Sequence, residues 1–319
     1  MRSLIFKLLF LFLISELYIS AEMLSRSKVA MGTFVTISLD EQNKNYIEDG
    51  FNIVNDVELS LSSYNPEATI YKLNKNKTVS LDTHTYESLL LSKKYHEQTN
   101  GYFDITIGSI TKDLYKFGEA EMIPIKSKLE NAMVDFKGLS FTNKEAFILK
   151  NMKVDLGGMG KGFAVDEVYK YFKAKNIKKA IIAASGDIRC IGECTIDVAD
   201  PDTDATMLSF VTLQNDMAIS TSGNYNRYVT SVEHNHLINP KSKKSQLNFV
   251  SITLISTMSN SDLDAYATAV SVMPSDAAYK FLNALDLAYI IMQSDKKLRY
   301  SDNIDTYIKN LVLHDRVKK

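Results

Sequence analysis

The chain has 319 residues, of which 45% are hydrophobic and 24% are charged, and its formal net charge is -1. This composition is typical of a globular protein and argues against a disordered or fibrous chain. Lys and Arg number 37 and Asp and Glu number 38, so the chain lacks the basic surplus that non-specific nucleic-acid binding requires. We therefore expect no nucleic-acid partner.

The N-terminus has the features of a secretory leader. Basic residues precede a short apolar run at 8–14, and small Ala21 marks a place where a signal peptidase could cut. The alternative is an uncleaved membrane anchor, but Glu16 interrupts the run, which is shorter than the roughly 20 residues that span a bilayer. We expect residues 1–21 to be a signal peptide and residues 22–319 to form the mature domain.

The first third of the mature chain predicts a strand and two helices. Alternating apolar residues within 29–40 indicate a half-buried strand. Apolar residues at spacings of three and four predict an amphipathic helix from about Ile47 to the segment SSYNP. A second helix is expected over 83–98, closing on Asn100 and Gly101, which are residue types that tolerate a left-handed cap.

The rest of the chain predicts a mixture of strands and helices. We expect a strand that ends at Leu156, a glycine turn, and then a helix with Val165, Val168 and Phe172 on one face. Further strands are expected within 178–188, 205–214, 217–222, 249–256, 287–293 and 297–301, and two helices within 262–285. No repeat or linker divides the chain, so we predict a single intertwined α+β unit with mainly antiparallel sheet rather than a doubly wound parallel sheet.

The two cysteines flank a predicted turn. Cys190 and Cys194 lie on either side of Gly192, in what looks like a hairpin of two short strands. A cross-strand disulfide could form in an oxidising compartment, but adjacent strand positions strain such a bond. We expect two reduced, half-buried cysteines in preference to a disulfide, and no metal site here, because nothing else supplies soft ligands.

The segment VDLGGMGKGFAVD, residues 154–166, concentrates four glycines and a lysine. Glycines let backbone amides approach an anion closely, a helix N-terminus adds a positive dipole, and Lys161 adds a full charge. The spacing matches neither the Walker A loop nor the dinucleotide-binding pattern. An anion site and a tight turn packed by glycines both remain open.

A second segment, SDLDAYATAVSVM at residues 261–273, predicts a site for a hard cation. In a helix, Asp264 and Thr268 lie one turn apart on the same face and offer a carboxylate and a hydroxyl. Such oxygens suit Mg²⁺, which keeps several waters and shares ligands with phosphates. The alternative is that Asp264 stabilises the helix N-terminus while Thr268 faces the core.

Eight motifs, in chain order, resemble those of the ApbE family of FAD:protein FMN transferases. They are MGTFVTISL, LSLSSYNPEATIYKLNK, TNGYFDITIGSI, VDLGGMGKGFAVD, SGDIRCIG, AISTSGNYNRY, HLINP and DAYATAVSVM. The match runs across nearly the whole mature chain. Eight motifs in one order are far more specific than a single glycine loop.

The resemblance implies a periplasmic, Mg-dependent enzyme that cleaves FAD, attaches FMN to a threonine or serine of a target flavoprotein, and releases AMP. The implied acceptor is a flavoprotein subunit of a membrane redox complex, with an association at the inner membrane surface. Two alternatives remain: an FAD pyrophosphatase that releases free FMN and AMP, and a non-catalytic periplasmic FAD-binding protein.

The resemblance also implies site residues, position by position. The flavin contacts would be Met31, Tyr64, Tyr102, Phe103, Asp104, Asp155, Lys161 and Leu237. The magnesium ligands would be the side chains of Asp264 and Thr268 and the backbone carbonyls of Gly158 and Ala267. A base is needed near the acceptor hydroxyl, and His236 or Asp264 is the candidate.

Four departures from the family pattern stand out. Asn239 replaces the aspartate of H-I-I-D-P-x-T-G, and KSK replaces its T-G end. Ser185 replaces the first glycine of G-G-D, and Ile105 replaces the proline after F-D. Asp155 and Asp187 are retained, so the changes bear on the adenine or diphosphate contacts more than on the class of reaction.

Overall fold

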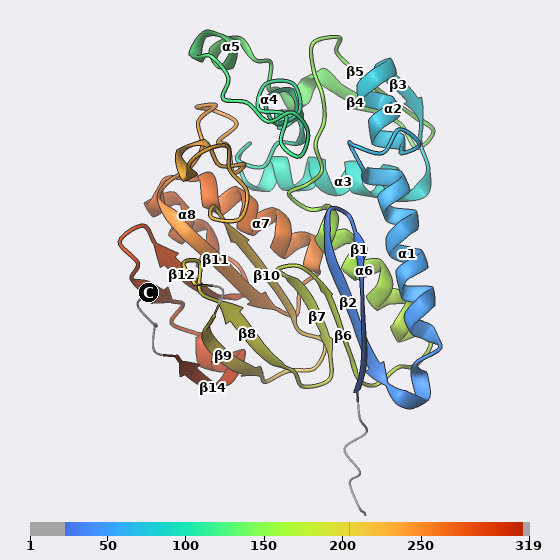
Figure 1. Ribbon diagram of the computed structural model, residues 1–319, viewed down its shortest axis with the longest axis vertical. Coiled ribbons are helices and arrows are strands. Elements are labelled where there is room, and N and C mark those ends of the chain that lie inside the picture. Colours follow the sequence, from blue (N-terminus) through green and yellow to red (C-terminus); the bar gives the residue numbers. More distant parts are fainter. Residues whose placement is uncertain (1–22, 204, 315–319) are drawn as a thin grey trace, which may run out of the picture.

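Figure 1 shows the computed structural model, which describes residues 23–203 and 205–314. The predicted signal peptide, residues 1–21, therefore lies outside the described residues. In the described ranges, no helix has the length and apolar character needed to cross a membrane.

An eight-stranded sheet forms the lower part of the molecule as drawn in Figure 1. Its strands, in spatial order, are β1 (Met23–Ala30), β2 (Thr33–Asp40), β6 (Ala180–Ala184), β7 (Asp187–Ile191), β10 (Ala218–Gly223), β11 (Phe249–Ser256), β12 (Ala288–Gln293) and β13 (Leu298–Tyr300). All its strand pairings within the described residues are antiparallel. The predicted α+β class with mainly antiparallel sheet is confirmed.

Two three-stranded sheets complete the strands. One has the order β14-β9-β8 and comprises Ile308–Leu313, Thr206–Thr212 and Thr195–Ala199. Its apolar residues share one buried cluster with residues of β7, β10, β11 and β12, so it covers one face of the large sheet. The other has the order β3-β5-β4 and comprises Thr78–Ser80, Glu145–Ile148 and Leu139–Phe141. It lies in the upper part of Figure 1 with α2 (Thr69–Asn76), α4 (Gly108–Thr111) and α5 (Lys126–Asn131).

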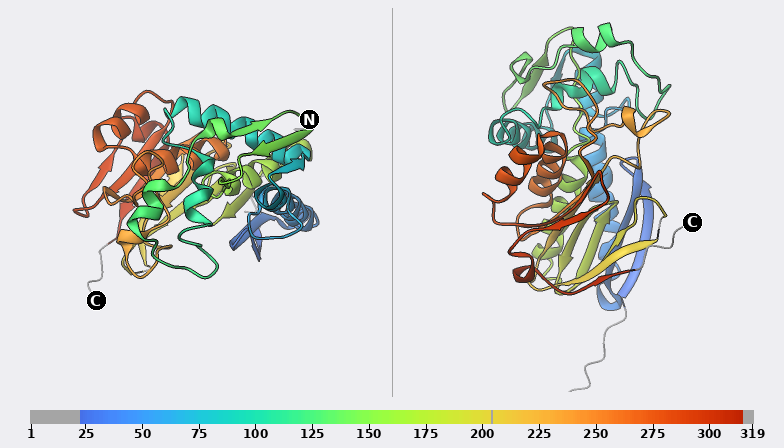
Figure 2. Two further views of the ribbon diagram at one scale, coloured as in Figure 1. Left: turned by 90° about the horizontal axis from the view of Figure 1, so that it is seen from above. Right: turned by 90° about the vertical axis from the view of Figure 1, so that its left-hand side faces the viewer.

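Long helices cover the opposite face of the large sheet. They are α1 (Tyr46–Leu61), α6 (Gly160–Ala174) and α7 (Asn260–Val272), with α3 (Thr83–Gln98) and α8 (Ser275–Leu282) beside them. Buried Val35 and Ile37 of β2 pack with Phe51 of α1 and Val168 of α6 in one cluster. Figure 2 shows the molecule from two further sides, with α4 and α5 beyond one end of the large sheet.

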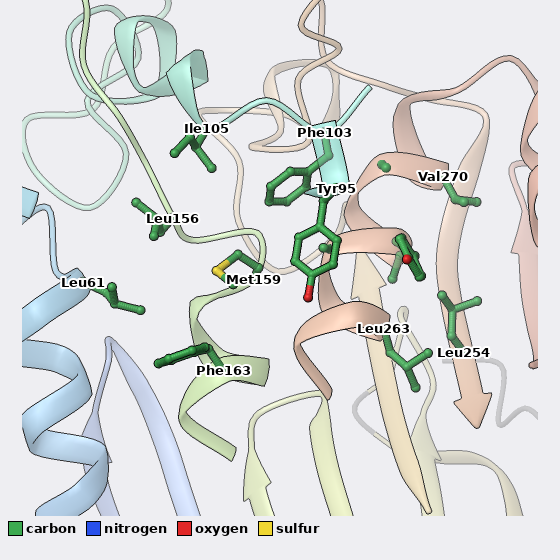
Figure 3. Close-up of a cluster of buried hydrophobic side chains, with 14 of the residues drawn as sticks. Leu61, Tyr95, Phe103, Ile105, Leu156, Met159, Phe163, Leu254, Leu263 and Val270 are labelled. Atoms are coloured by element: carbon green, nitrogen blue, oxygen red, sulfur yellow. The ribbon is translucent and has the colours of Figure 1, made fainter. Parts of the chain in front are cut away.

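The core directly beneath that end contains many aromatic side chains, as Figure 3 shows. The ring of Tyr95 lies edge-on to both Phe103 and Tyr266, with 5.7 Å between ring centroids in each pair. Met159, just before α6, is fully buried in the same cluster. This packing fixes the glycine turn and the start of α6 against α3 and α7.

Several local predictions are confirmed in detail. The strand expected within 29–40 is β2 together with the end of β1, and the two form a hairpin that turns at Met31 and Gly32, where φ is 52° and 71°. The helix expected over 83–98 is α3. Asn100 and Gly101 follow it with φ of 51° and 74°, as the left-handed cap requires.

The strand expected to end at Leu156 is wrong. The helix after it, α6, forms as predicted, but the preceding segment joins no sheet. The side chain of Asn74 takes the place of a neighbouring strand: its amide donates to Val154 O at 2.8 Å, and its carbonyl oxygen accepts from Val154 N at 2.7 Å. Apolar periodicity cannot distinguish this arrangement from a strand, because the segment is extended and buried in both cases.

The prediction of two reduced cysteines is also wrong. Cys190 and Cys194 form a disulfide, and both side chains are buried. The expected hairpin does not exist, since β7 pairs with β6 and β10 in the large sheet, whereas β8 pairs with β9 in a small one. The two cysteines therefore do not occupy adjacent paired strands, and the disulfide closes the corner where the chain passes from one sheet to the other.

Candidate functional site

Lys161, in the first turn of α6, joins acidic residues from two other elements. Its Nζ lies 2.9 Å from Asp187 Oδ2 on β7 and 3.2 Å from Asp264 Oδ2 on α7. Asp264 Oδ2 also accepts from Gly162 N at 3.2 Å, and Ser220 Oγ donates to Asp187 Oδ1 at 2.6 Å. We refer to the two carboxylates of Asp187 and Asp264, together with the Lys161 that they share, as the acidic triad. It ties α6, α7 and the large sheet together.

Gly162 makes the close approach of α6 to α7 possible. A Cβ atom at this position would lie 2.4 Å from Asn260 O, at the start of α7. No side chain fits there without moving one of the helices. At least one glycine of the motif thus serves packing, the structural alternative left open by the sequence.

Burial and charge set the protonation of the acidic triad. Burial and repulsion from Asp264 together raise the pKa of Asp187 to about 7. Burial disfavours the charge on Lys161, but the attraction of the two carboxylates outweighs burial and raises its pKa. Lys161 therefore stays protonated at neutral pH, with 28% of its side chain exposed.

The glycine turn meets α7 at Thr268. A Cβ atom on Gly158 would lie 3.3 Å from Thr268 Oγ1 and 3.3 Å from Phe103 Cε2. Within the described chain, the Thr268 hydroxyl forms no hydrogen bond, although a helical threonine commonly bonds back to a carbonyl one turn earlier. Its unused hydroxyl lies on the same helix face as Asp264, so the two side chains and the adjacent turn offer oxygens that fit a hard cation.

The other predicted metal ligand, Ala267, is fully buried in α7. In the ranges that the structure describes, no group of three or more His, Cys, Asp or Glu residues is arranged to hold a metal.

Replacing Thr268 by valine should leave folding intact and weaken metal dependence. The hydroxyl has no partner among the described residues, so its loss should change the free energy of unfolding by less than about 0.5 kcal/mol. Half-maximal activity should need roughly 10-fold more Mg²⁺. Titration of activity with Mg²⁺ and urea unfolding measure the two effects, and Thr268→Ser should behave like the wild type. An unchanged Mg²⁺ requirement in Thr268→Val would remove Thr268 from the ligands.

Asp155 anchors a second polar cluster, near the N-terminal side of the glycine turn. Its Oδ2 accepts from Thr111 Oγ1 at 2.7 Å and lies 3.3 Å from Lys112 Nζ, while its Oδ1 accepts from Gly157 N at 3.0 Å. Burial alone would raise the pKa of this carboxyl, but Lys112 and the two hydrogen bonds outweigh burial and lower the pKa. Asp155 is therefore charged, and it fixes the backbone of the turn.

Tyr64 belongs to the same cluster through Lys112. The Tyr64 hydroxyl donates to Phe117 O at 2.7 Å and accepts from Lys112 Nζ and Arg227 Nη2, each at 2.5 Å. The hydroxyl is thus fully used within the protein. The Lys112 ammonium also lies 3.8 Å from the ring centroid, and Tyr64 is 39% exposed, so a ligand would meet this residue through its ring.

His236 lies between the two clusters. Its Nδ1 and its backbone N are 3.0 Å and 3.1 Å from Arg227 O. Because a carbonyl oxygen only accepts, Nδ1 carries the proton and Nε2 is left as an acceptor. Burial, with the charges of Arg227 and Lys161, lowers the pKa of His236 to about 4, against the opposing effects of the hydrogen bond to Arg227 O and the charge of Asp155.

The structure gives the remaining predicted flavin contacts different surroundings. Met31 forms the tip of the β1–β2 hairpin, and its Cε would be 3.8 Å from a Cβ on Gly160. Tyr102 is half-buried, with Lys241 Nζ 4.1 Å from its ring centroid. Leu237 follows His236 and is buried.

Phe103 and Asp104 are occupied within the protein. Phe103 is buried beside Tyr95, with its edge toward Gly158. Asp104 accepts from Thr106 N at 2.8 Å and Thr106 Oγ1 at 2.6 Å, and so caps its own turn. Burial raises the pKa of Asp104, against the effect of these hydrogen bonds. Its carboxylate is thus engaged locally rather than joined to the acidic triad.

Two departures from the family pattern have clear structural consequences. The Asn239 amide donates to Val272 O at 2.7 Å, at the end of α7, and its Oδ1 accepts from Lys241 N at 2.8 Å. An ionised aspartate has no donor for the first of these bonds. Ser185 has φ of 57°, in the left-handed region that glycine adopts without a steric penalty.

Sequence reasoning did not assign Lys112, Arg227 or Asp187 to the site. Asp187 stands in SGDIRCIG and could have been found as the charged residue of that motif. Lys112 lies outside the quoted motifs, and Arg227 stands in AISTSGNYNRY without a role that the sequence assigns. Both reach the site because Tyr64 and Asp155 bring distant segments together.

Comparison with known proteins gives consistent matches along the chain. The family model described as ApbE matches residues 31–291. The FAD:protein FMN transferase of Klebsiella pneumoniae (strain 342) is 26% identical over 298 residues, which cover 87% of this chain and 94% of that protein. The Vibrio cholerae protein of the same name is 24% identical over 308 residues, covering 89% of this chain and 92% of that protein.

Solved structures show the same fold. The ApbE protein of Thermotoga maritima superposes with a TM-score of 0.83 at 23% identity, covering 91% of this chain and all (100%) of that one. The flavin transferase ApbE of Vibrio cholerae superposes with a TM-score of 0.77 at 22% identity, covering 90% and 99%. With a family match over most of its length and this fold, the chain belongs to the ApbE family.

Proposed function

We propose that this chain is an FAD:protein FMN transferase that depends on Mg²⁺, modifies a threonine or serine of a flavoprotein, and releases AMP. One observation carries the proposal: the acidic triad and the glycine turn meet at one end of the sheet with the Thr268 hydroxyl, which has no hydrogen-bond partner among the described residues. The relatives named FAD:protein FMN transferase support the reaction class.

The residues around α7 would hold the metal. Asp264 and Thr268 would contribute side-chain oxygens, and Gly158 and Ala267 would contribute carbonyls. When bound, Mg²⁺ would neutralise charge that develops on the diphosphate oxygens of FAD. Lys161 lies 3.2 Å from Asp264 and would place a second positive charge beside the same diphosphate.

His236 is better suited than Asp264 to accept the proton of the acceptor hydroxyl. Asp264 is tied to Lys161 and Gly162, whereas His236 is neutral and presents a bare Nε2. The hydroxyl oxygen would attack the FMN-side phosphorus, its proton would pass to His236 Nε2, and the bond to the bridging oxygen would break. The bonding electrons would leave with AMP, and FMN would remain on the acceptor as a phosphoester.

The low pKa of His236 predicts the pH dependence of the reaction. The base works only when neutral, so kcat/KM should be constant near neutral pH and fall with an inflection at about 4. A pH profile of kcat/KM for FAD measures this, and His236→Ala should lose the inflection along with most of the activity. An inflection near the ordinary histidine value of about 6.5 would contradict the assignment.

We also propose that the protein works in the periplasm, on a flavoprotein subunit of a redox complex at the inner membrane surface. The leader-like residues 1–21 support export. The disulfide between Cys190 and Cys194 agrees with an oxidising compartment, where such bonds persist.

Mass spectrometry tests the proposed function. The mature chain is incubated with FAD, Mg²⁺ and a co-expressed flavoprotein subunit, and the acceptor is examined for an FMN-sized addition on one threonine or serine. We expect that addition and an equal amount of AMP. Free FMN and AMP with an unmodified acceptor would instead identify a pyrophosphatase, and intact FAD would identify a binding protein.

A further inference from the structure

The geometry points to Arg227 as a further binding residue for the diphosphate of FAD, in addition to Lys161. The inference rests on the proposed function, because FAD is taken as the ligand. Arg227 lies between β10 and β11, in the motif AISTSGNYNRY, and the predicted ligand set does not include it.

Arg227 differs from the other two cations of the site in its partners. Lys161 is held by Asp187 and Asp264, and Lys112 lies 3.3 Å from Asp155. For Arg227, no carboxylate oxygen of a described residue lies within 4.0 Å of the guanidinium. Within the described ranges its side chain donates one hydrogen bond, from Nη2 to the Tyr64 hydroxyl at 2.5 Å. The guanidinium keeps its full charge and has donors that no described residue uses.

A backbone contact and a side-chain contact place Arg227 at the candidate site. The Arg227 carbonyl accepts from the backbone N and Nδ1 of His236, and the side chain holds Tyr64, a predicted flavin contact. The charge of Arg227 also lowers the pKa of both His236 and Asp155. Arg227 is half-buried, so its charge is screened less than that of an exposed arginine.

A guanidinium with open donors is suited to phosphate oxygens. Its planar fork can donate two parallel hydrogen bonds, and charge-assisted bonds of this kind are about twice as strong as neutral ones. The ligand class that uses this feature is a flavin carrying a phosphate or diphosphate, as opposed to the uncharged flavin ring. Arg227 should therefore discriminate between FAD and riboflavin, which lacks phosphate.

Flavin binding without turnover tests the inference. Quenching of flavin fluorescence gives the Kd of FAD and of riboflavin for the mature chain in EDTA, so that no metal-dependent reaction intervenes. Arg227→Gln should raise the Kd for FAD roughly 10-fold to 100-fold and change the Kd for riboflavin less than about 2-fold. Arg227→Lys should recover part of the FAD affinity, because it keeps the charge but not the fork.

Two controls separate charge recognition from structural support. Tyr64→Phe removes the acceptor of the Arg227 hydrogen bond and keeps the charge of Arg227. It should therefore raise the Kd of FAD and of riboflavin to a similar extent. Arg299→Gln, on β13, removes a distant arginine that donates to Gln293 at 3.0 Å, and should change neither Kd. If Arg227→Gln weakens riboflavin as much as FAD, or leaves FAD unaffected, the inference is wrong.

The outcome is distinguishable from failure of the proposed function. If the wild type binds FAD but modifies no acceptor, and Arg227→Gln loses FAD affinity, the role of Arg227 is supported and the transferase function is overturned. A wild-type chain that binds FAD no better than riboflavin would overturn both.

Discussion

Asp264→Ala should lower flavin transfer by roughly 1000-fold or more, the larger of two expected effects on this site. Asp264 would supply the one carboxylate among the predicted metal ligands, and its carboxylate also accepts from Gly162 N and pairs with Lys161. Its removal would both abolish metal binding and release the start of α6. Initial rates of acceptor labelling at saturating FAD and Mg²⁺ measure the loss.

Asp262 provides the matched control on the same helix. It also lies in the first turns of α7, but its carboxylate pairs with Lys94 at 2.7 Å instead of with the acidic triad. Asp262→Ala should keep activity within about 2-fold of the wild type, because such ion pairs contribute roughly 1 kcal/mol or less. Near-normal transfer in Asp264→Ala would refute the metal assignment.

Lys161→Met should have the largest effect on stability. The substitution leaves Asp187 and Asp264 as two buried carboxylates without their shared cation, and breaking such a buried pair costs roughly 3–5 kcal/mol. The sequence places Lys161 only among the flavin contacts and gives no sign of this role in stability. Urea unfolding measures the free energy, and the loss should shrink as the pH falls below neutrality, because protonation removes the uncompensated charge.

Two further variants test the cause. In the double variant Lys161→Met with Asp187→Asn, one of the two charges disappears, so most of the lost stability should return. Lys170→Met, further along α6, removes an exposed lysine paired with Glu167 and should cost less than about 1 kcal/mol. Equal losses for Lys161→Met and Lys170→Met would show that the acidic triad is not a stabilising unit.

The sequence predicted best those elements whose causes are local. The helices α1 and α3 follow from apolar spacing and from caps such as Asn100 and Gly101, which act within one turn. The extended segment before Leu156 was misread because its partner, Asn74, is 80 residues away in the chain. The disulfide was missed for a similar reason, since the sheet change between β7 and β8 depends on β9 and β10.

For the site, the motifs identified residues but not their pairings. Lys161 and Asp264 were both named as candidates, yet nothing in the sequence indicates that they contact each other and share Asp187. Asp104 is a predicted flavin contact, and nothing in the sequence indicates that its Oδ1 accepts two hydrogen bonds from Thr106. Charge pairing depends on the packing of α6, α7 and the sheet, and this packing is a property of the whole fold.

The central claim is that Asp264 and Thr268 hold a divalent cation beside the glycine turn, against the diphosphate of FAD. A crystal of the mature chain with FAD and Mn²⁺ in place of Mg²⁺ tests it through the anomalous signal of the metal. We expect a single strong anomalous peak, which places the metal within bonding distance of Asp264 and Thr268, and both phosphorus atoms next to Gly158. A peak elsewhere, or a diphosphate far from the turn, would contradict the account.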